Sequence, residues 1–202
     1  MKEEYSEYLI TQTLLSSWLY SLASEEGTDE FIKKLNRENV PQSKAALDGI
    51  RFENVLNSVL QGEKLPEDHE WYEPITELAA SEWIKGGQSQ VKLSRSITVN
   101  GVNILLFGVL DFLKEGVITD TKYSKSYKYG KYLGSPQHSL YFALVPEARR
   151  FDYKVCDGKN IYTESYYPEE TLPIERLIAQ FISYLHTYGY WDTFAEKWRA
   201  KK

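Results

Sequence analysis

One short segment of the chain brings together residue types that support metal-dependent chemistry on phosphoryl groups. Asp111, Asp120 and Lys122 lie within the 12 residues DFLKEGVITDTK. Carboxylate oxygens are ligands that suit Mg²⁺ and Mn²⁺. An ion held in this way lowers the pKa of a bound water and stabilises charge on a phosphoryl oxygen, and a nearby lysine can orient that water. The residue types therefore predict a hydrolytic site.

Two strands of one hairpin carry these residues. The run 102–112 is nearly continuously apolar, and 117–123 follows it after a short turn. Antiparallel pairing would bring Asp111 close to Asp120, and Asp120 and Lys122 face the same side because they are two residues apart on a strand. The alternative is a solvent-facing hairpin that carries the three residues by chance, since short motifs recur often. Charges at the ends of core strands are costly unless they are paired or bind metal, and this cost favours the site.

Helical patterns flank the hairpin on both sides. Before it, helices are predicted over 5–23, 28–37, 41–62 and from Pro74 to about 85, with EEGTD as the first break. An alternating strand over 90–99 and the turn Asn100-Gly101 lead into the hairpin. After it, the sequence predicts a helix over 134–145 with Ser135 as N-cap and Pro136 at N1, strands over 151–157 and 160–166, and helices over 173–188 and 191–200.

The order of these elements predicts an α/β fold, a single domain with a central mixed β-sheet flanked by helices. A length of 202 residues suits one domain. The helical N-terminal part covers 1–88, the core with the motifs covers 89–166, and the C-terminal helices cover 172–200.

Composition limits the classes of partner. The net charge is -5, so any nucleic acid must be met by a local basic patch. The single cysteine, Cys156, excludes a disulfide framework and an iron–sulfur cluster with four cysteine ligands. The acidic, polar N-terminus is unlike a signal peptide, and no apolar run is long enough to span a membrane. We expect a cytoplasmic protein of a bacterial or phage-infected cell, with no membrane partner.

Three sequence motifs resemble those of the PD-(D/E)XK nuclease superfamily. GVLDFLKEGVITDTKYS resembles its active-site hairpin, with Asp111 as the first acid and Asp120-Thr121-Lys122 as (D/E)-x-K. QHSLY matches the Q-x3-Y motif of the branch that contains RecB-type nucleases, lambda-type exonuclease and the CRISPR adaptation exonucleases. GIRFENVL resembles the first helix motif of this branch, with an acid four residues after a glycine.

The resemblance implies a restriction-endonuclease-like core and a role for each motif residue. Asp111 and Asp120 would bind Mg²⁺ or Mn²⁺, with the carbonyl of Thr121 as a further ligand, and Glu53 would complete the site or hold a second ion. Lys122 would position or activate the water. The sequence departs from the family pattern in three ways: Leu110 replaces a proline, Glu53 stands where several relatives have histidine, and a cysteine cluster is missing, which implies a subtype without an iron–sulfur centre.

Gln137 and Tyr141 of QHSLY lie one helical turn apart on one face. The resemblance implies that they buttress Lys122 and the scissile phosphate. Ordinary helix packing is the alternative for both residues, and an exposed helix position is the alternative for Glu53.

A run of lysines and tyrosines follows the hairpin. Lys125, Lys128 and Lys131 recur every three residues, and tyrosines such as Tyr127 lie between them. Ammonium groups supply phosphate contacts that do not depend on base sequence, and tyrosines offer stacking faces to unpaired bases. We therefore predict a nucleic-acid-binding strip, with an ordinary solvated loop as the alternative.

The leading hypothesis is an Mg²⁺- or Mn²⁺-dependent DNA nuclease, an exonuclease that acts on ends or single strands in recombination, repair or phage DNA metabolism. The second hypothesis is a catalytically inactive module of the same fold that binds DNA or a protein partner, as an inhibitor or assembly factor does. A third is a structural subunit, because the aromatic C-terminus SYLHTYGYWDTFAEKW could form the surface of a homo-oligomer.

Overall fold

Six strands form one mixed sheet in the computed structural model, which describes residues 7–200. The strands are β1 (Tyr8–Thr11), β2 (Gln88–Val99), β3 (Val102–Lys114), β4 (Val117–Tyr123), β5 (Arg150–Cys156) and β6 (Ile161–Tyr166). Their order is β1-β3-β4-β5-β6, and β2 pairs with β3. This architecture confirms the predicted α/β fold with a central mixed sheet.

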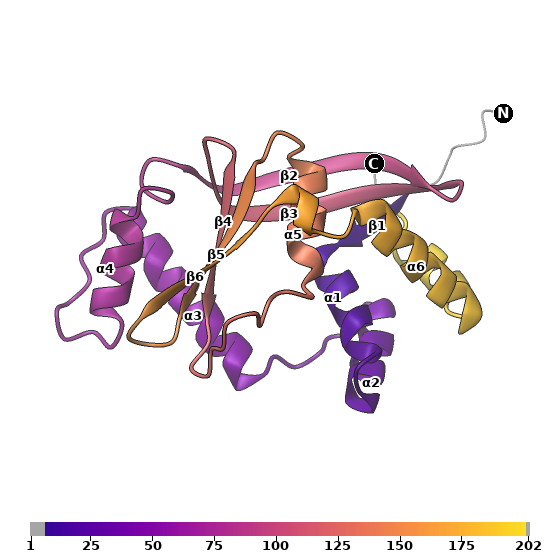
Figure 1. Ribbon diagram of the computed structural model, residues 1–202. Helices are drawn as coiled ribbons and strands as arrows, with labels where there is room; N and C mark the ends of the chain where they lie inside the picture. The colour runs from indigo at the N-terminus through magenta and orange to yellow at the C-terminus, as the bar shows by residue number, and fades with distance from the viewer. Residues whose placement is uncertain (1–6, 201–202) are drawn as a thin grey trace.

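The long strand β3 joins two halves of the sheet. Along nearly its whole length, β3 pairs antiparallel with β2. On its other edge it pairs first with β1, at residues 104–107, and then with β4, at residues 112–114. β5 runs parallel to β4 and antiparallel to β6. Figure 1 shows the resulting bend between the β1–β3 half and the β4–β6 half.

Seven α-helices flank the sheet in residues 7–200. They are α1 (Gln12–Ser21), α2 (Glu25–Leu35), α3 (Lys44–Leu60), α4 (Tyr72–Ala80), α5 (Pro136–Leu144), α6 (Ile174–Thr187) and α7 (Trp191–Lys197), and a short 3₁₀ helix covers Pro168–Glu170. Thr11, Ser24, Ser43 and Ser135 cap the starts of α1, α2, α3 and α5 by accepting a backbone N–H bond. Among the helices of these residues, none has the length and apolar character that a membrane crossing requires.

The helices pack at opposite ends of the sheet (Figure 1). α3 and α4 pack on the β4 side, where a small hydrophobic cluster contains Phe52, Leu56, Trp71, Ile75 and Phe112. α1, α2, α5, α6 and α7 enclose the main core against β1–β3 and β5. The motif hairpin β3–β4 lies at the junction of these two clusters, because Leu110 belongs to one and Phe112 to the other.

The sequence predicted the β2–β3 hairpin and α5 well. Asn100 and Gly101 both have positive φ, 51° and 78°, as a two-residue type I′ turn requires. Ser135 is the N-cap of α5 and Pro136 its first residue. Both predictions are confirmed. The sequence could predict these features because they depend on local backbone chemistry.

Gly108 allows α5 to lie directly on β3. A Cβ at this position would meet Tyr141 Cε1 at 2.7 Å and Leu144 Cδ1 at 2.8 Å. Real Cβ atoms do not approach other heavy atoms so closely, so a larger residue would require the Tyr141 and Leu144 side chains to shift. The glycine therefore leaves room for the side chains of the helix that carries Gln137 and Tyr141.

Four predicted boundaries in the N-terminal part are wrong. The predicted helix 5–23 contains the strand β1. β1 pairs with residues of β3 that lie about 100 positions further along the chain, and such a distant partner leaves no local signal in the sequence. Residues 5 and 6 lie outside the described range. EEGTD is the first turn of α2 and not a break, because Ser24 caps it. α3 begins at Lys44 and not at Pro41, and α4 covers 72–80 and not 74–85.

Candidate active site

Asp111 and Asp120 lie next to each other across the β3–β4 pair. The antiparallel register ends at Phe112↔Thr119, and one further step would pair Asp111 with Asp120. In place of that rung, Asp111 Oδ2 accepts hydrogen bonds from Thr121 N at 3.0 Å and Thr121 Oγ1 at 3.3 Å. The Asp111 side chain therefore binds β4 at the point where the backbone pairing of β3 and β4 ends.

Asp120 is held from two sides. Its side chain is buried, and Gln137 Nε2 donates to Oδ1 at 2.5 Å. Lys122 Nζ lies 2.6 Å from Oδ2. The ammonium of Lys122 is thus the near partner of the buried Asp120 Oδ2. The helix motif and the hairpin motif thus meet on one carboxylate.

The crowding of these charges shifts the pKa values of Asp111 and Lys122. Burial, followed by the negative charges of Asp120 and Glu53, raises the pKa of Asp111 to about 8, against the opposing effects of Lys122 and the Thr121 N–H. Burial on its own lowers the pKa of Lys122, but Asp120 and Asp111 raise it above its usual value. Lys122 is therefore an ammonium, and in the absence of a metal ion the Asp111 carboxyl keeps its proton at neutral pH.

Tyr141 holds the strand and not the lysine. Its hydroxyl donates to the carbonyl of Val109 at 2.8 Å, two residues before Asp111. Burial and then Asp120 raise the pKa of Tyr141 to about 12, so it remains a neutral donor. In the described residues the Tyr141 hydroxyl bonds to the backbone of β3 and not to Lys122, and its role in buttressing Lys122 and the scissile phosphate stays a prediction.

Gln137 is oriented by a tyrosine that the sequence motifs do not include. Tyr153 on β5 lies beside Asp120 in the parallel register. Its hydroxyl lies 3.1 Å from Ser135 Oγ and 3.4 Å from Gln137 Oε1. The single hydroxyl proton has Ser135 Oγ as its nearer acceptor, and the longer contact is consistent with an amide whose Oε1 faces Tyr153 and whose Nε2 faces Asp120.

Glu53 lies near the pair but does not join it in one cluster. Its Oε1 accepts a hydrogen bond from Gln90 Nε2 at 3.2 Å, and its charge contributes to the raised pKa of Asp111. Across residues 7–200, no three or more His, Cys, Asp or Glu side chains are grouped closely enough to hold a metal ion. The structure therefore brings Asp111 and Asp120 together and places Glu53 at the edge of the site.

Gln90 has an unusual backbone for a strand residue. Its φ is +51°, and it would pair with Asp111 in the β2–β3 register, but the ladder has no rung there while Ser89↔Phe112 and Val91↔Leu110 are paired on either side. The alternating pattern of 90–99 does not reveal this interruption, so sequence reasoning missed Gln90 as a residue of the site.

The residues at the centre fit a divalent cation. Both aspartates offer oxygen ligands, and Asp120 Oδ2 is buried beside Lys122 Nζ. Asp111 accepts its bonds on Oδ2, which leaves Oδ1 without a donor among the described residues. Carboxylate oxygens are the donor type that Mg²⁺ or Mn²⁺ prefers. Lys122 Nζ now occupies the neighbourhood of one of these oxygens.

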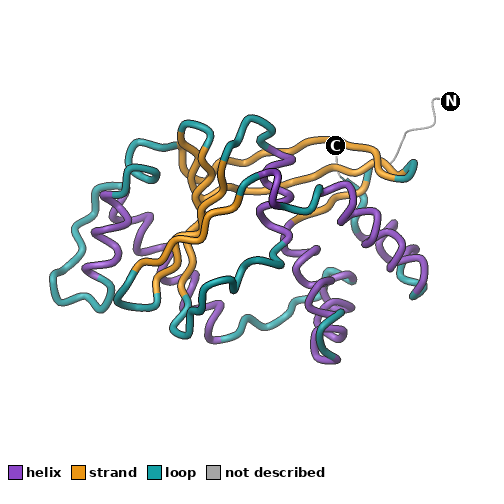
Figure 2. The backbone as a smooth tube through the Cα atoms, in the orientation of Figure 1, coloured by secondary structure: helices purple, strands orange, loops and turns teal. Residues whose placement is uncertain are grey.

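The lysine–tyrosine run forms a loop, residues 124–135, that connects β4 to α5 (Figure 2). Lys125 is exposed and lies 3.6 Å from Asp48 on α3. Lys131 Nζ donates to Ser124 Oγ at 2.7 Å, and Lys128 is exposed. Tyr127 is half-buried, with its ring centroid 4.9 Å from that of Tyr162. The loop is therefore a folded segment whose lysines lie at its surface.

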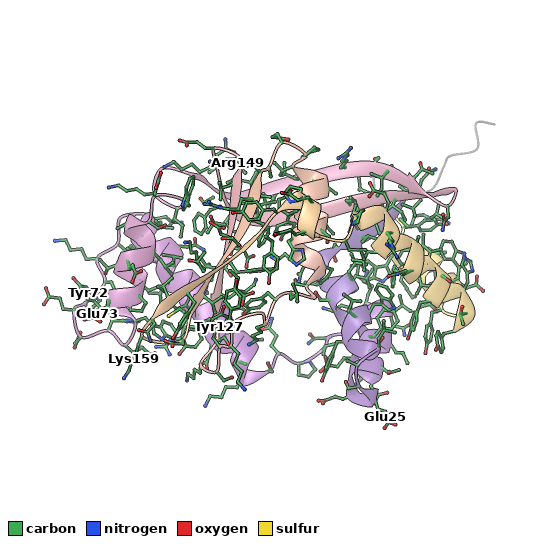
Figure 3. All side chains as sticks on the ribbon, in the orientation of Figure 1. Glu25, Tyr72, Glu73, Tyr127, Arg149 and Lys159 are labelled. Carbon is green, nitrogen blue, oxygen red and sulfur yellow. The ribbon has the colours of Figure 1, made fainter. Side chains whose placement is uncertain are left out.

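Figure 3 shows where this loop lies relative to the strands. Tyr127 and Lys159 mark one end of the β4–β6 half, whereas Arg149 marks the opposite end. Because Lys122 is near the end of β4 that leads into the loop, the lysines follow directly on the site. A third residue that the sequence does not reveal, Glu164 on β6, accepts hydrogen bonds from Tyr127 and Gly130 of the loop, and its sequence context is that of an ordinary strand glutamate.

The fold of the chain is similar to that of two solved structures. The crystal structure of SSO0001 is similar, with a TM-score of 0.53 and 19% sequence identity over 93% of this chain and 79% of that chain. The crystal structure of the exonuclease LHK-Exo in complex with dAMP is also similar, with a TM-score of 0.52 and 14% identity over 93% of both chains. At these identities the likeness shows the fold. No protein-family model and no curated protein sequence matches the chain.

Proposed function

We propose that the chain is an Mg²⁺- or Mn²⁺-dependent DNA nuclease, an exonuclease that hydrolyses phosphodiester bonds in recombination, repair or phage DNA metabolism. One observation carries the proposal: Asp111 and Asp120 are adjacent, with Lys122 Nζ 2.6 Å and Gln137 Nε2 2.5 Å from Asp120. The shared fold with an exonuclease supports it.

Asp111 and Asp120 would hold the divalent ion, with Glu53 at the edge of the site. When bound, the ion supplies Lewis acidity and a water of lowered pKa. Its charge would also offset the burial and the repulsion by Asp120 that raise the pKa of Asp111, so the ion and the ionised carboxylate stabilise each other.

Lys122 would act as an electrostatic group and not as a base. Its raised pKa keeps it protonated at neutral pH, so it cannot accept a proton from water. An ammonium can donate hydrogen bonds to the attacking water and to the phosphoryl oxygens on which negative charge grows. Gln137 keeps Asp120 in place, and Tyr153 keeps Gln137 in place. Tyr141 fixes the backbone that leads to Asp111.

Degradation of end-labelled linear DNA tests the proposal. We expect the wild type to release labelled fragments with Mg²⁺ or Mn²⁺ and to release none with EDTA. Asp120→Ala and Lys122→Ala should lose activity by about 10²-fold or more, since each removes a group from the transition state. Equal activity of the wild type and Asp120→Ala would contradict the assignment of the site.

A second candidate is a nuclease-fold module that binds DNA or a protein partner without cleavage. It is favoured by the ion pair, because Lys122 already neutralises Asp120 in the arrangement described, and by the position of Glu53 outside a three-carboxylate group. Calorimetric titration with Mn²⁺ separates the two candidates. Binding in the micromolar range together with cleavage supports the nuclease, whereas no binding below millimolar Mn²⁺ and no cleavage support the module.

A further inference from the structure

The loop 124–135 is fastened to the sheet by a buried carboxylate. Glu164 on β6 is 1% exposed. Its Oε1 accepts hydrogen bonds from Tyr127 Oη at 2.5 Å and Gly130 N at 2.9 Å, and its Oε2 accepts one from Tyr166 Oη at 2.6 Å. Burial on its own would raise the pKa of Glu164, but these hydrogen bonds lower it below its ordinary value. Glu164 is thus an ionised anchor for the loop.

Two further contacts fix the end of the loop that approaches α5. The Tyr132 ring stacks on Tyr153, with 4.6 Å between centroids and 24° between planes. Tyr153 in turn lies within hydrogen-bond distance of Gln137, whose Nε2 donates to Asp120. The loop is therefore ordered, and its fixed end packs directly behind the site.

This ordered loop nevertheless presents two large apolar side chains to solvent. Tyr129 is 82% exposed and Leu133 is 71% exposed, the highest values among the large hydrophobic side chains of the described residues. A turn with Leu133 N bonded to Gly130 O at 3.2 Å brings Leu133 back beside the segment that carries Tyr129. Glu164 binds the Tyr127 side chain and the Gly130 backbone on the side of the sheet. Tyr129 lies between these two positions in the chain, and its side chain is exposed to solvent.

We propose that Tyr129 and Leu133 form a contact surface for unpaired bases, so that the site takes single-stranded or frayed DNA ends in preference to paired duplex. The inference rests on the proposed function and names its substrate class. A tyrosine ring offers a stacking face to any base, whereas paired bases hide their faces inside the duplex. Two exposed lysines on the same loop supply charge for the phosphates of such a strand: Lys128, and Lys125, whose Nζ also lies 3.6 Å from Asp48 Oδ2. The loop therefore combines the two recognition elements of a single-strand binder.

Fluorescence anisotropy in EDTA tests this inference without cleavage. The probes are a labelled 20-nucleotide single strand and the blunt duplex of the same sequence, each titrated with the full chain. The Tyr129→Ala/Leu133→Ala double variant changes only exposed side chains, and Tyr129→Trp keeps a stacking face. Tyr188→Ala is the matched control, because Tyr188 is 63% exposed and follows α6 on another part of the molecule.

We expect the double variant to bind the single strand roughly tenfold more weakly, as loss of a stacked base predicts. Its Kd for the duplex should change less than twofold, and Tyr129→Trp and Tyr188→Ala should keep the wild-type affinity for the single strand. An unchanged Kd for the single strand in the double variant, or an equal loss on both probes, would overturn the inference alone. A wild type that binds neither probe would overturn the nucleic-acid part of the proposed function together with it.

Discussion

Gln137 Nε2 lies 2.5 Å from Asp120 Oδ1, and this hydrogen bond joins the helix motif to the hairpin motif. Both side chains are buried, so the bond is shielded from water. The approach of α5 to β3 at Gly108 and the contact of Tyr153 with the Gln137 amide both serve to keep it in place. The helix thus determines how Asp120 points toward its neighbours.

Replacement of Gln137 should therefore impair catalysis more than folding. We expect Gln137→Ala to reduce single-turnover cleavage by about 10–100-fold at saturating Mn²⁺, the usual loss when the partner of a metal-ligating carboxylate is removed. Gln180→Ala is the matched control, since Gln180 is exposed on α6. Cleavage by Gln137→Ala at the wild-type rate would show that this bond does not position Asp120.

Asp111 should make the metal-free protein less stable as the pH rises. Its pKa is about 8 in the folded protein and about 3.8 when the chain is unfolded, so the folded state holds the extra proton between these values. The free energy of unfolding then falls with rising pH across this window. Asp111→Asn removes the titration and should unfold at a higher temperature than the wild type at pH 8.5, by about 2–4 °C for each kcal/mol recovered.

Thermal unfolding from pH 4 to pH 9 in EDTA measures this difference. We expect the melting temperatures of wild type and Asp111→Asn to diverge as the pH rises, and Mn²⁺ to stabilise only the wild type. Parallel curves for the two proteins across this range would contradict the raised pKa.

The left-handed backbone at Gln90 should cost stability. A residue other than glycine at φ +51° is strained by roughly 1–2 kcal/mol, which glycine avoids. We therefore expect Gln90→Gly to raise the melting temperature by about 2–4 °C, and to weaken Mn²⁺ binding because Glu53 loses the amide that orients it. Calorimetry in the presence and absence of Mn²⁺ measures both effects.

Gln88→Gly provides the control for Gln90→Gly. Gln88 is exposed on the same strand but is not among the residues with positive φ, so glycine there should lower stability by roughly 0.5–1 kcal/mol. If both glycine variants destabilise the protein equally, the backbone at Gln90 stores no strain.

The elements that the sequence predicted correctly depend on short-range chemistry. The Asn100-Gly101 turn, the apolar run of β3 and the Ser135-Pro136 start of α5 each carry a local signal. The sequence predicts a helix at Tyr8–Thr11, but this segment forms the strand β1 through its pairing with residues 104–107. Such a contact, far away in sequence, leaves no periodicity of its own.

The residues of the candidate site also form two groups, those that short-range chemistry predicts and those that depend on distant contacts. Asp111, Asp120 and Lys122 are adjacent because a tight hairpin must bring them together, and their spacing predicted it. Gln90, Tyr153 and Glu164 escaped notice because their roles depend on contacts with residues on other elements. Glu164 alternates in β6 like a solvent-facing residue, but its partners Tyr127 and Gly130 lie more than 30 residues away and bury it.

The most direct test of a metal-dependent nuclease site is a crystal structure with Mn²⁺ soaked in, refined against anomalous data. We expect one anomalous peak within about 2.0–2.6 Å of an oxygen of Asp111 and an oxygen of Asp120. We also expect Lys122 Nζ to have moved away from Asp120 Oδ2, where it now lies at 2.6 Å. No peak between the two aspartates, with the ion pair unchanged at saturating Mn²⁺, would contradict the account.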